Sequence, residues 1–248
     1  MSGIIAGFGG WRLVYVIAAI LNLIMILIMI YVLPDLPRKN KLTSYKKLIF
    51  SVFTAAKRYK VLPRILLQSG LIFGLIFNIF WTSLTFLLSG SPFNYTTTQI
   101  GLVSLAGLVT SLFGVVVGKL QDNGLSIPAL GLFIFLSLIG TSTLLLNQSI
   151  ITVIIVTALI SIAVQGVLIL SQTRLFSLSN NERSRLNTVF VVNNFIFGAM
   201  GSALSSFLWS YGGLQYVMIG SIIISSIGLI AWFSSRTVYY EMDNKLEN

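Results

Sequence analysis

The residues of this chain best suited to chemistry are neutral amides placed inside long apolar runs. An amide left unpaired in hydrocarbon costs about 4–8 kcal/mol, so each should face another helix or a wet cavity. Asn78 and Thr82 are four residues apart and share one helix face, beside the aromatic Trp81. The candidate cavity residues are Gln68, Asn78, Trp81, Thr82, Gln165, Asn193 and Asn194, with Gln172 two turns beyond Gln165. Their chemistry is hydrogen bonding, either to a solute or between helices, where it is worth about 0.6 kcal/mol on average.

Catalytic chemistry lacks its usual side chains in this sequence. The chain has no histidine and no cysteine, which removes the commonest general base and the thiolate metal ligands. It offers no nucleophile–base arrangement, paired carboxylates or metal cluster. We therefore expect neither an enzyme nor a metal or cofactor site. Arg12 is the first residue of the first predicted membrane segment, and no charged residue lies deeper inside any of them, so a buried proton carrier is not expected either.

The elements that position the amides are long apolar helices. Hydrophobic residues make up 56% of the 248 and charged residues only 9%, whereas soluble domains carry about 25% charged residues. Backbone groups in lipid must be satisfied internally, so apolar runs of about 20 residues are helices. Seven such runs occur, at 12–33, 65–88, 98–118, 127–147, 150–171, 186–208 and 214–235. The sequence predicts an all-α membrane protein with seven transmembrane helices.

The basic residues predict the orientation. Of the 16 Lys and Arg residues, every one except Arg12 falls in segments on the same side of the predicted helices. The positive-inside rule then places the N-terminus outside and the C-terminus in the cytoplasm of a cell (plasma) membrane. Segment 34–64 is a basic cytoplasmic linker, in which an amphipathic helix is expected to lie on the inner leaflet. The expected partner of this charge is the lipid bilayer, not nucleic acid.

Small residues form two stripes that predict close helix packing. One stripe contains Gly107, Thr110, Gly114 and Gly118, and the other contains Gly198, Gly201, Ser202, Ser205 and Ser206. Each stripe lies on the middle member of a three-helix group. Because a three-helix group reverses the chain direction, the two groups are expected to form an inverted 3+3 repeat.

A polar turn between two apolar runs carries a family motif. Residues 118–124 read G-K-L-Q-D-N-G, in which Gly118, Leu120 and Asp122 match a G-x-L-x-D loop motif, although Leu125 stands where stronger copies continue with basic residues. Further similar stretches are S-G-I-I-A-G-F-G-G-W-R at 2–12, N-I-F-W-T-S-L-T-F-L-L at 78–88 and N-E-R-S-R-L-N-T at 181–188. On these residues the chain resembles the major facilitator superfamily, over its sixth to twelfth helices.

The resemblance implies a secondary transporter with a cavity between two six-helix halves. It divides the chain into the end of family helix five with helix six (1–33), the linker (34–64), the C-terminal six-helix half (65–235) and a cytoplasmic tail (236–248). Gly118, Leu120 and Asp122 would form a cytoplasmic gate motif. The implied activity is alternating-access transport of a small-molecule substrate, as drug or metabolite efflux. The N-terminal half is missing, so the first helix should be stranded and the truncated chain should not transport alone.

Two other interpretations remain open. A complete seven-helix receptor has the same predicted topology and would answer a ligand through a transducer. A non-transporting membrane subunit or relic would insert but move no substrate, even when supplied with the missing half.

Overall fold

The computed structural model describes residues 2–32 and 58–247. Every regular element in these ranges is a helix, which confirms the predicted all-α membrane protein. The predicted amphipathic helix of the linker lies outside the described residues as far as position 57. Five described helices are long and apolar enough to cross a membrane: Gly10–Val32, Leu62–Ser89, Ser126–Leu146, Ile150–Ser177 and Arg183–Glu241.

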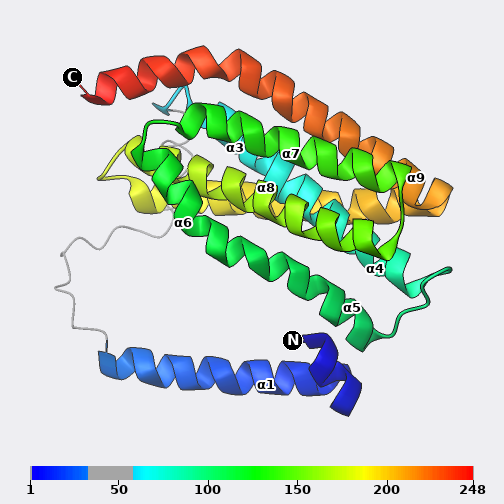
Figure 1. The fold of residues 1–248 in the computed structure, drawn as a ribbon. Coiled ribbons are helices and arrows are strands. Elements are labelled where there is room, and N and C mark those ends of the chain that lie inside the picture. The colour runs from blue at the N-terminus through cyan, green and yellow to red at the C-terminus, as the bar shows by residue number, and fades with distance from the viewer. Residues whose placement is uncertain (1, 33–57, 248) are drawn as a thin grey trace.

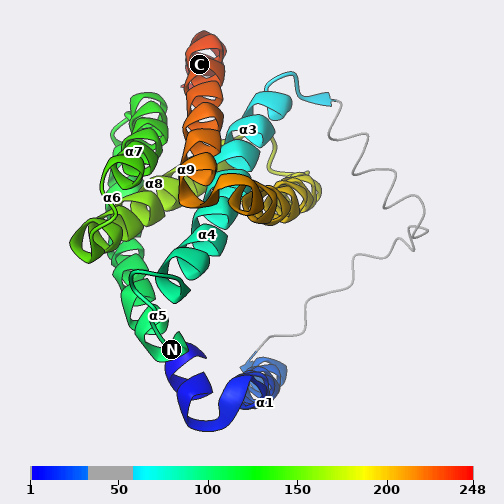
Figure 2. The same ribbon diagram turned by 90° about the vertical axis from the view of Figure 1, so that its right-hand side faces the viewer.

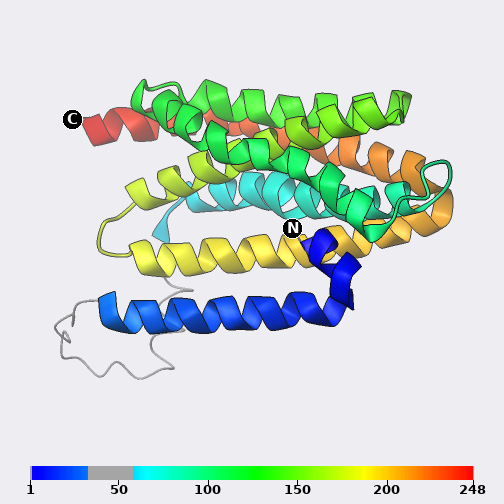
Figure 3. The same ribbon diagram turned by 60° about the horizontal axis from the view of Figure 1, so that its bottom comes forward.

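Helix α1 (Ser2–Val32) lies apart from the other long helices (Figures 1 and 2). At Gly10 the backbone φ is +74°, a left-handed conformation that glycine adopts without strain. The residues before Gly10 turn back toward α5, as Figure 3 shows. None of the most apolar window of Gly10–Val32 is buried inside the protein. The most apolar part of α1 is therefore not covered by the other described helices.

The second predicted helix is continuous from Leu62 to Ser89 but changes its winding. It begins as α3 (Leu62–Ser69), becomes a π-helix, η1 (Gly70–Ile76), and ends as α4 (Phe77–Ser89). Within the π-helical part the Phe77 N–H bonds to the Ile72 carbonyl, five residues back. A π-helical turn rotates the side chains that follow it relative to those before it, and such turns are frequent at functional sites.

The third predicted helix is interrupted. Residues 97–122 form α5 (Thr97–Ser104), a short 3₁₀ turn η2 (Leu105–Leu108) and α6 (Val109–Asp122). Thr96 starts α5 through a capping box with Gln99, in which the Thr96 N–H donates to Gln99 Oε1 at 2.8 Å. Gly124, with φ +71°, then makes the turn into the next helix.

The remaining helices are α7 (Ser126–Leu146), α8 (Ile150–Ser177) and α9 (Arg183–Glu247). Ser149 starts α8 by accepting a hydrogen bond from the Thr152 N–H. Helix α9 reverses direction at Gly212 and Gly213, where the backbone is not helical, so its two arms run in opposite directions along the bundle (Figures 1 and 3). Its second arm continues to Glu247, well past the predicted end at residue 235.

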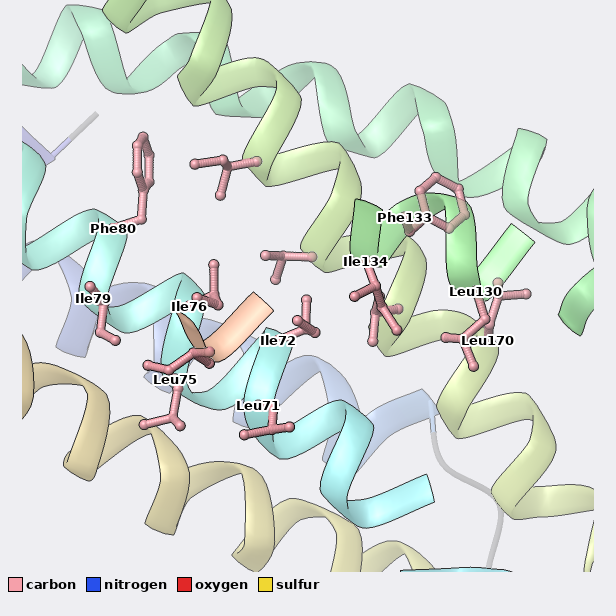
Figure 4. Close-up of a cluster of buried hydrophobic side chains, with 14 of the residues drawn as sticks. Leu71, Ile72, Leu75, Ile76, Ile79, Phe80, Leu130, Phe133, Ile134 and Leu170 are labelled. Atoms are coloured by element: carbon pink, nitrogen blue, oxygen red, sulfur yellow. The ribbon is translucent and has the colours of Figure 1, made fainter. Parts of the chain in front are cut away.

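The core forms where η1 and α4 meet α7 and α8. Ile72, Ile76 and Phe80 of the central helix (Leu62–Ser89) belong to one buried cluster with Ile134 of α7 and Leu170 of α8, and none of these side chains is more than 1% exposed (Figure 4). The central helix thus has one face fixed in the core, and its opposite face packs on the first arm of α9.

Small residues let α9 approach that opposite face closely. A Cβ atom added at Gly74 would lie 2.4 Å from Phe197 Cβ, and one added at Gly201 would lie 2.8 Å from the Leu75 carbonyl oxygen. The predicted close packing is therefore confirmed for this stripe. It is wrong for the end of the other stripe, because a Cβ at Gly118 would meet nothing within 4 Å and one at Gly114 only Ile169, at 4.0 Å.

Candidate functional site

A cavity of about 650 Å³ opens between the central helix, α8 and the first arm of α9. Ligand pockets typically measure about 300–1,000 Å³, so a small organic molecule fits this space. Its wall is formed by Phe73, Phe77, Asn78, Leu168, Gln172, Phe190, Val191, Asn194, Phe195, Gly198, Ala199 and Ser202. None of these side chains is charged.

Three of the residues that line the cavity carry amides, and each amide is held by a hydrogen bond within the protein. Ser69 donates a buried hydrogen bond from Oγ to Asn194 Oδ1 at 2.9 Å. Asn78 donates from Nδ2 to the Gly74 carbonyl oxygen at 2.8 Å. Gln172 donates from Nε2 to Asn187 Oδ1 at 3.3 Å. The Gly74 carbonyl oxygen can only accept, so its bond also fixes the orientation of the Asn78 amide.

Gly198 leaves the room that the Asn78 amide occupies. A Cβ atom at Gly198 would lie 3.0 Å from Asn78 Nδ2. Any larger side chain on this face of α9 would push the amide from its place or force the helices apart. The Asn78 side chain thus packs closely against Gly198 of α9 at the cavity wall.

Aromatic rings form the apolar part of the wall. Phe73 and Phe77 stack with ring centroids 5.6 Å apart and an interplanar angle of 12°. Trp81 extends the row edge-on, with its centroid 6.0 Å from that of Phe77. Because these residues are four apart, they lie on one face, and Phe73 and Phe77 present a continuous aromatic surface to the cavity.

The predicted cavity residues divide into two groups in the structure. Asn78 and Asn194 line the cavity, whereas Gln68, Trp81, Thr82, Gln165 and Asn193 are not among its lining residues.

Two of the others hold helices together. The Tyr239 hydroxyl donates to Gln68 Oε1 at 3.0 Å, and Asn193 Nδ2 donates to the Leu66 carbonyl oxygen at 2.9 Å. Trp81 Nε1 is buried and has no hydrogen-bond partner among the described residues, while Thr82 and Gln165 are half-buried.

Arg174 is a buried cation that the sequence did not reveal. The expected end of its helix at residue 171 placed it in a cytoplasmic loop, but α8 continues to Ser177 and leaves Arg174 only 5% exposed. Its Nη2 donates to Ser126 Oγ at 2.7 Å, and its guanidinium lies 4.3 Å from the centroid of the Tyr239 ring. Residues 167–178 contain no glycine or proline, which was the signal that the helix continues.

The G-x-L-x-D turn lies at the end of α6. Asp122 is the last residue of that helix and is exposed, and no ion pair involving it occurs among the described residues. The Leu125 N–H donates to the Leu120 carbonyl oxygen at 2.9 Å and closes the turn. A Cβ atom added at Gly118 would have no atom within 4 Å.

The loop between α8 and α9 carries an acidic anchor. Glu182 Oε1 lies 3.2 Å from Arg58 Nη1 and 3.8 Å from Arg185 Nη1, and the Tyr59 hydroxyl donates to Glu182 Oε2 at 2.7 Å. Only 14% of the Glu182 side chain is exposed. This carboxylate therefore attaches the end of the linker to the α8–α9 loop.

The long apolar helices and the cavity between them define a multi-pass, all-helical membrane protein. Comparison with known families identifies the class further, because the model of the Major Facilitator Superfamily matches residues 1–173. The chain belongs to this family of membrane transporters, and the resemblance read from its motifs is confirmed.

Its relatives are named as transporters. The chain is 32% identical over 234 residues to the "Uncharacterized transporter YgaY" of Escherichia coli O157:H7 and to the "Putative uncharacterized transporter YgaY" of Escherichia coli (strain K12). It is 26% identical over 219 residues to the "Probable transporter SCO4007" of Streptomyces coelicolor. These matches cover 94% and 86% of this chain, but 59% and 50% of the relatives. The chain thus spans little more than half the length of these relatives.

Proposed function

We propose that this chain forms the substrate-binding part of a secondary transporter that moves a small solute by alternating access, as drug or metabolite efflux. The observation that supports this most directly is the cavity, where oriented amides from α4, α8 and α9 meet an aromatic wall. Amides on separate helices can change their spacing when the helices rock, which is the motion that alternating access requires.

The proposed topology has seven membrane crossings. The reversal at Gly212 and Gly213 supports counting α9 as two of them, and the run α5–η2–α6 would be another. The last six crossings would form an inverted 3+3 repeat. The concentration of basic residues supports a cytoplasmic linker and C-terminus and an outside N-terminus in the cell membrane, with Gly118, Leu120 and Asp122 as a cytoplasmic gate turn.

The proposed transporter needs further helices. The exposed length of α1 and the greater length of the relatives support a missing N-terminal half that packs against α1 and closes the cavity. In this proposal the chain alone binds its substrate but does not complete transport.

The experiment is a flux measurement in inverted membrane vesicles, with N-phenylnaphthylamine as a neutral fluorescent solute. Vesicles containing the chain together with the N-terminal helices of the Escherichia coli relative should move the dye when energised. Vesicles with the chain alone should not move the dye, and vesicles with Asn78→Leu in the pair should move it several-fold more slowly. Equal dye movement in all three preparations would contradict the proposal.

A further inference from the structure

We infer that the cavity selects an uncharged molecule with an aromatic body that carries both a hydrogen-bond donor and an acceptor. This inference rests on the proposed function for its biological meaning, and it names the substrate class of the same site. It follows from which polar atoms of the cavity wall are engaged in hydrogen bonds within the protein and which remain for a ligand.

The protein's own hydrogen bonds decide what Asn78 offers. The Gly74 carbonyl oxygen can only accept, so the group facing it at 2.8 Å must be the Asn78 amide nitrogen. Asn78 Oδ1 is left as an acceptor, and it does not belong to the fully buried polar atoms that have no partner. A ligand that binds Asn78 Oδ1 must therefore donate a hydrogen bond from an N–H or O–H group.

The neighbouring amides complete the pattern. As the structure orients them, Asn194 Oδ1 accepts from Ser69 and its amide nitrogen is the remaining donor. In the same orientation Gln172 Nε2 donates to Asn187, and Gln172 Oε1 is the remaining acceptor. The cavity thus presents two acceptors and one donor, which match a molecule that carries donors and an acceptor of its own.

The rest of the wall excludes charge and favours rings. No lining residue is charged, and an ion moved from water into such a wall would lose its hydration without gaining a counter-charge. The nearly parallel rings of Phe73 and Phe77 offer a flat apolar surface against which a planar group can pack. Both features favour a neutral aromatic amide or alcohol.

Binding to the whole chain in lipid nanodiscs tests this inference, with radiolabelled naphthamide as the probe and unlabelled analogues as competitors. Naphthamide carries both donor and acceptor, acetylnaphthalene only an acceptor, naphthoate a negative charge and naphthylmethylammonium a positive one. One lost hydrogen bond corresponds to about fivefold to tenfold in affinity. We expect acetylnaphthalene to bind weaker than naphthamide by that factor, and the two ions to compete more weakly still.

A variant separates recognition by Asn78 from general damage. Asn78→Leu should weaken naphthamide about fivefold to tenfold and leave acetylnaphthalene within about twofold, while the control Thr85→Val on the same helix should change neither. Three outcomes would overturn the inference. They are that naphthamide shows no displaceable binding, that either ion competes as well as naphthamide does, or that Asn78→Leu keeps the full preference for naphthamide over acetylnaphthalene. Because no flux is measured, selective binding by this chain, combined with no dye movement by the chain paired with its N-terminal half, would reject the proposed function and leave the inference standing.

Discussion

The Ser69 hydroxyl donates a hydrogen bond to Asn194 Oδ1 at 2.9 Å, and both side chains are buried. This bond joins α3 to the first arm of α9 beside the cavity, across 125 positions of sequence. It has two consequences, because it holds two helices together and it engages the amide of Asn194, a residue that lines the cavity. The stability of the bundle and the chemistry of the cavity therefore depend on the same contact.

Removing this bond should destabilise the protein measurably. Ser69→Ala leaves Asn194 Oδ1 without its partner, and we expect a loss of about 1 kcal/mol in the free energy of unfolding. Ser83→Ala is the matched control, because Ser83 is equally buried but donates to the Phe80 carbonyl oxygen of its own helix. Unfolding in detergent measures both. A larger loss in Ser83→Ala would contradict the assignment.

The contact between the central helix and α9 should not tolerate a methyl group. In Gly74→Ala the new Cβ would lie 2.4 Å from Phe197 Cβ, which cannot turn away because it is attached to the backbone. We expect a loss of about 1–3 kcal/mol in the free energy of unfolding. Gly118→Ala has no atom within 4 Å of its new Cβ and should leave the stability unchanged or raise it slightly. Equal melting temperatures for the two variants would refute this packing.

The hydroxyl of Tyr239 should contribute to the free energy of unfolding, whereas the hydroxyl of the neighbouring Tyr240 should not. Tyr239→Phe removes the donor to Gln68, a residue only 1% exposed, but keeps the ring beneath Arg174. The expected loss is about 1–3 kcal/mol, because Gln68 Oε1 is left buried and unpaired. Tyr240→Phe, at an exposed position, should have no effect. Thermal unfolding of the two variants side by side distinguishes them.

Glu182 should protect the end of the linker from proteolysis. In Glu182→Gln the attraction to Arg58 is lost, and the bond from Tyr59 becomes weaker because its acceptor is neutral. Trypsin should then cleave after Arg58 and Lys60 several-fold faster, as mass spectrometry of the fragments would show. High salt should accelerate cleavage of the unmodified protein toward the same rate. Asp122→Asn is the control, and it should not change cleavage at these sites.

Much of the fold followed from apolar run length, because lipid leaves the backbone few alternatives. The predicted helix at 127–147 differs by one residue at each end from α7, and the predicted loop at 209–213 contains the reversal at Gly212 and Gly213. The changes of winding at η1 and η2 were not predictable. Their sequences, G-L-I-F-G-L-I and L-A-G-L, are as apolar as their surroundings, and tertiary contacts decide their winding.

Polarity alone could identify candidate cavity residues, but it could not distinguish those that line the cavity from those that bond to another helix. Asn193 and Asn194 are adjacent and chemically identical, yet only Asn194 lines the cavity while Asn193 bonds across to Leu66. The difference is the rotation of α9 on the central helix, which the close contacts at Gly74 and Gly201 fix. Arg174 was missed for a related reason, because the end of α8 decides whether this residue lies in a loop or in the bundle.

The central claim is that the cavity around Asn78 is a substrate site that opens to water on one side of the membrane and then on the other. The chain contains no cysteine, so Asn78→Cys introduces a single thiol that can be labelled with a membrane-impermeant maleimide. Ile79→Cys, at a neighbouring position with no exposed surface, is the control. In right-side-out and inside-out vesicles carrying the chain with its proposed N-terminal half, the account predicts that Asn78→Cys reacts from both sides while Ile79→Cys stays protected. Complete protection of Asn78→Cys in both vesicle orientations would contradict it.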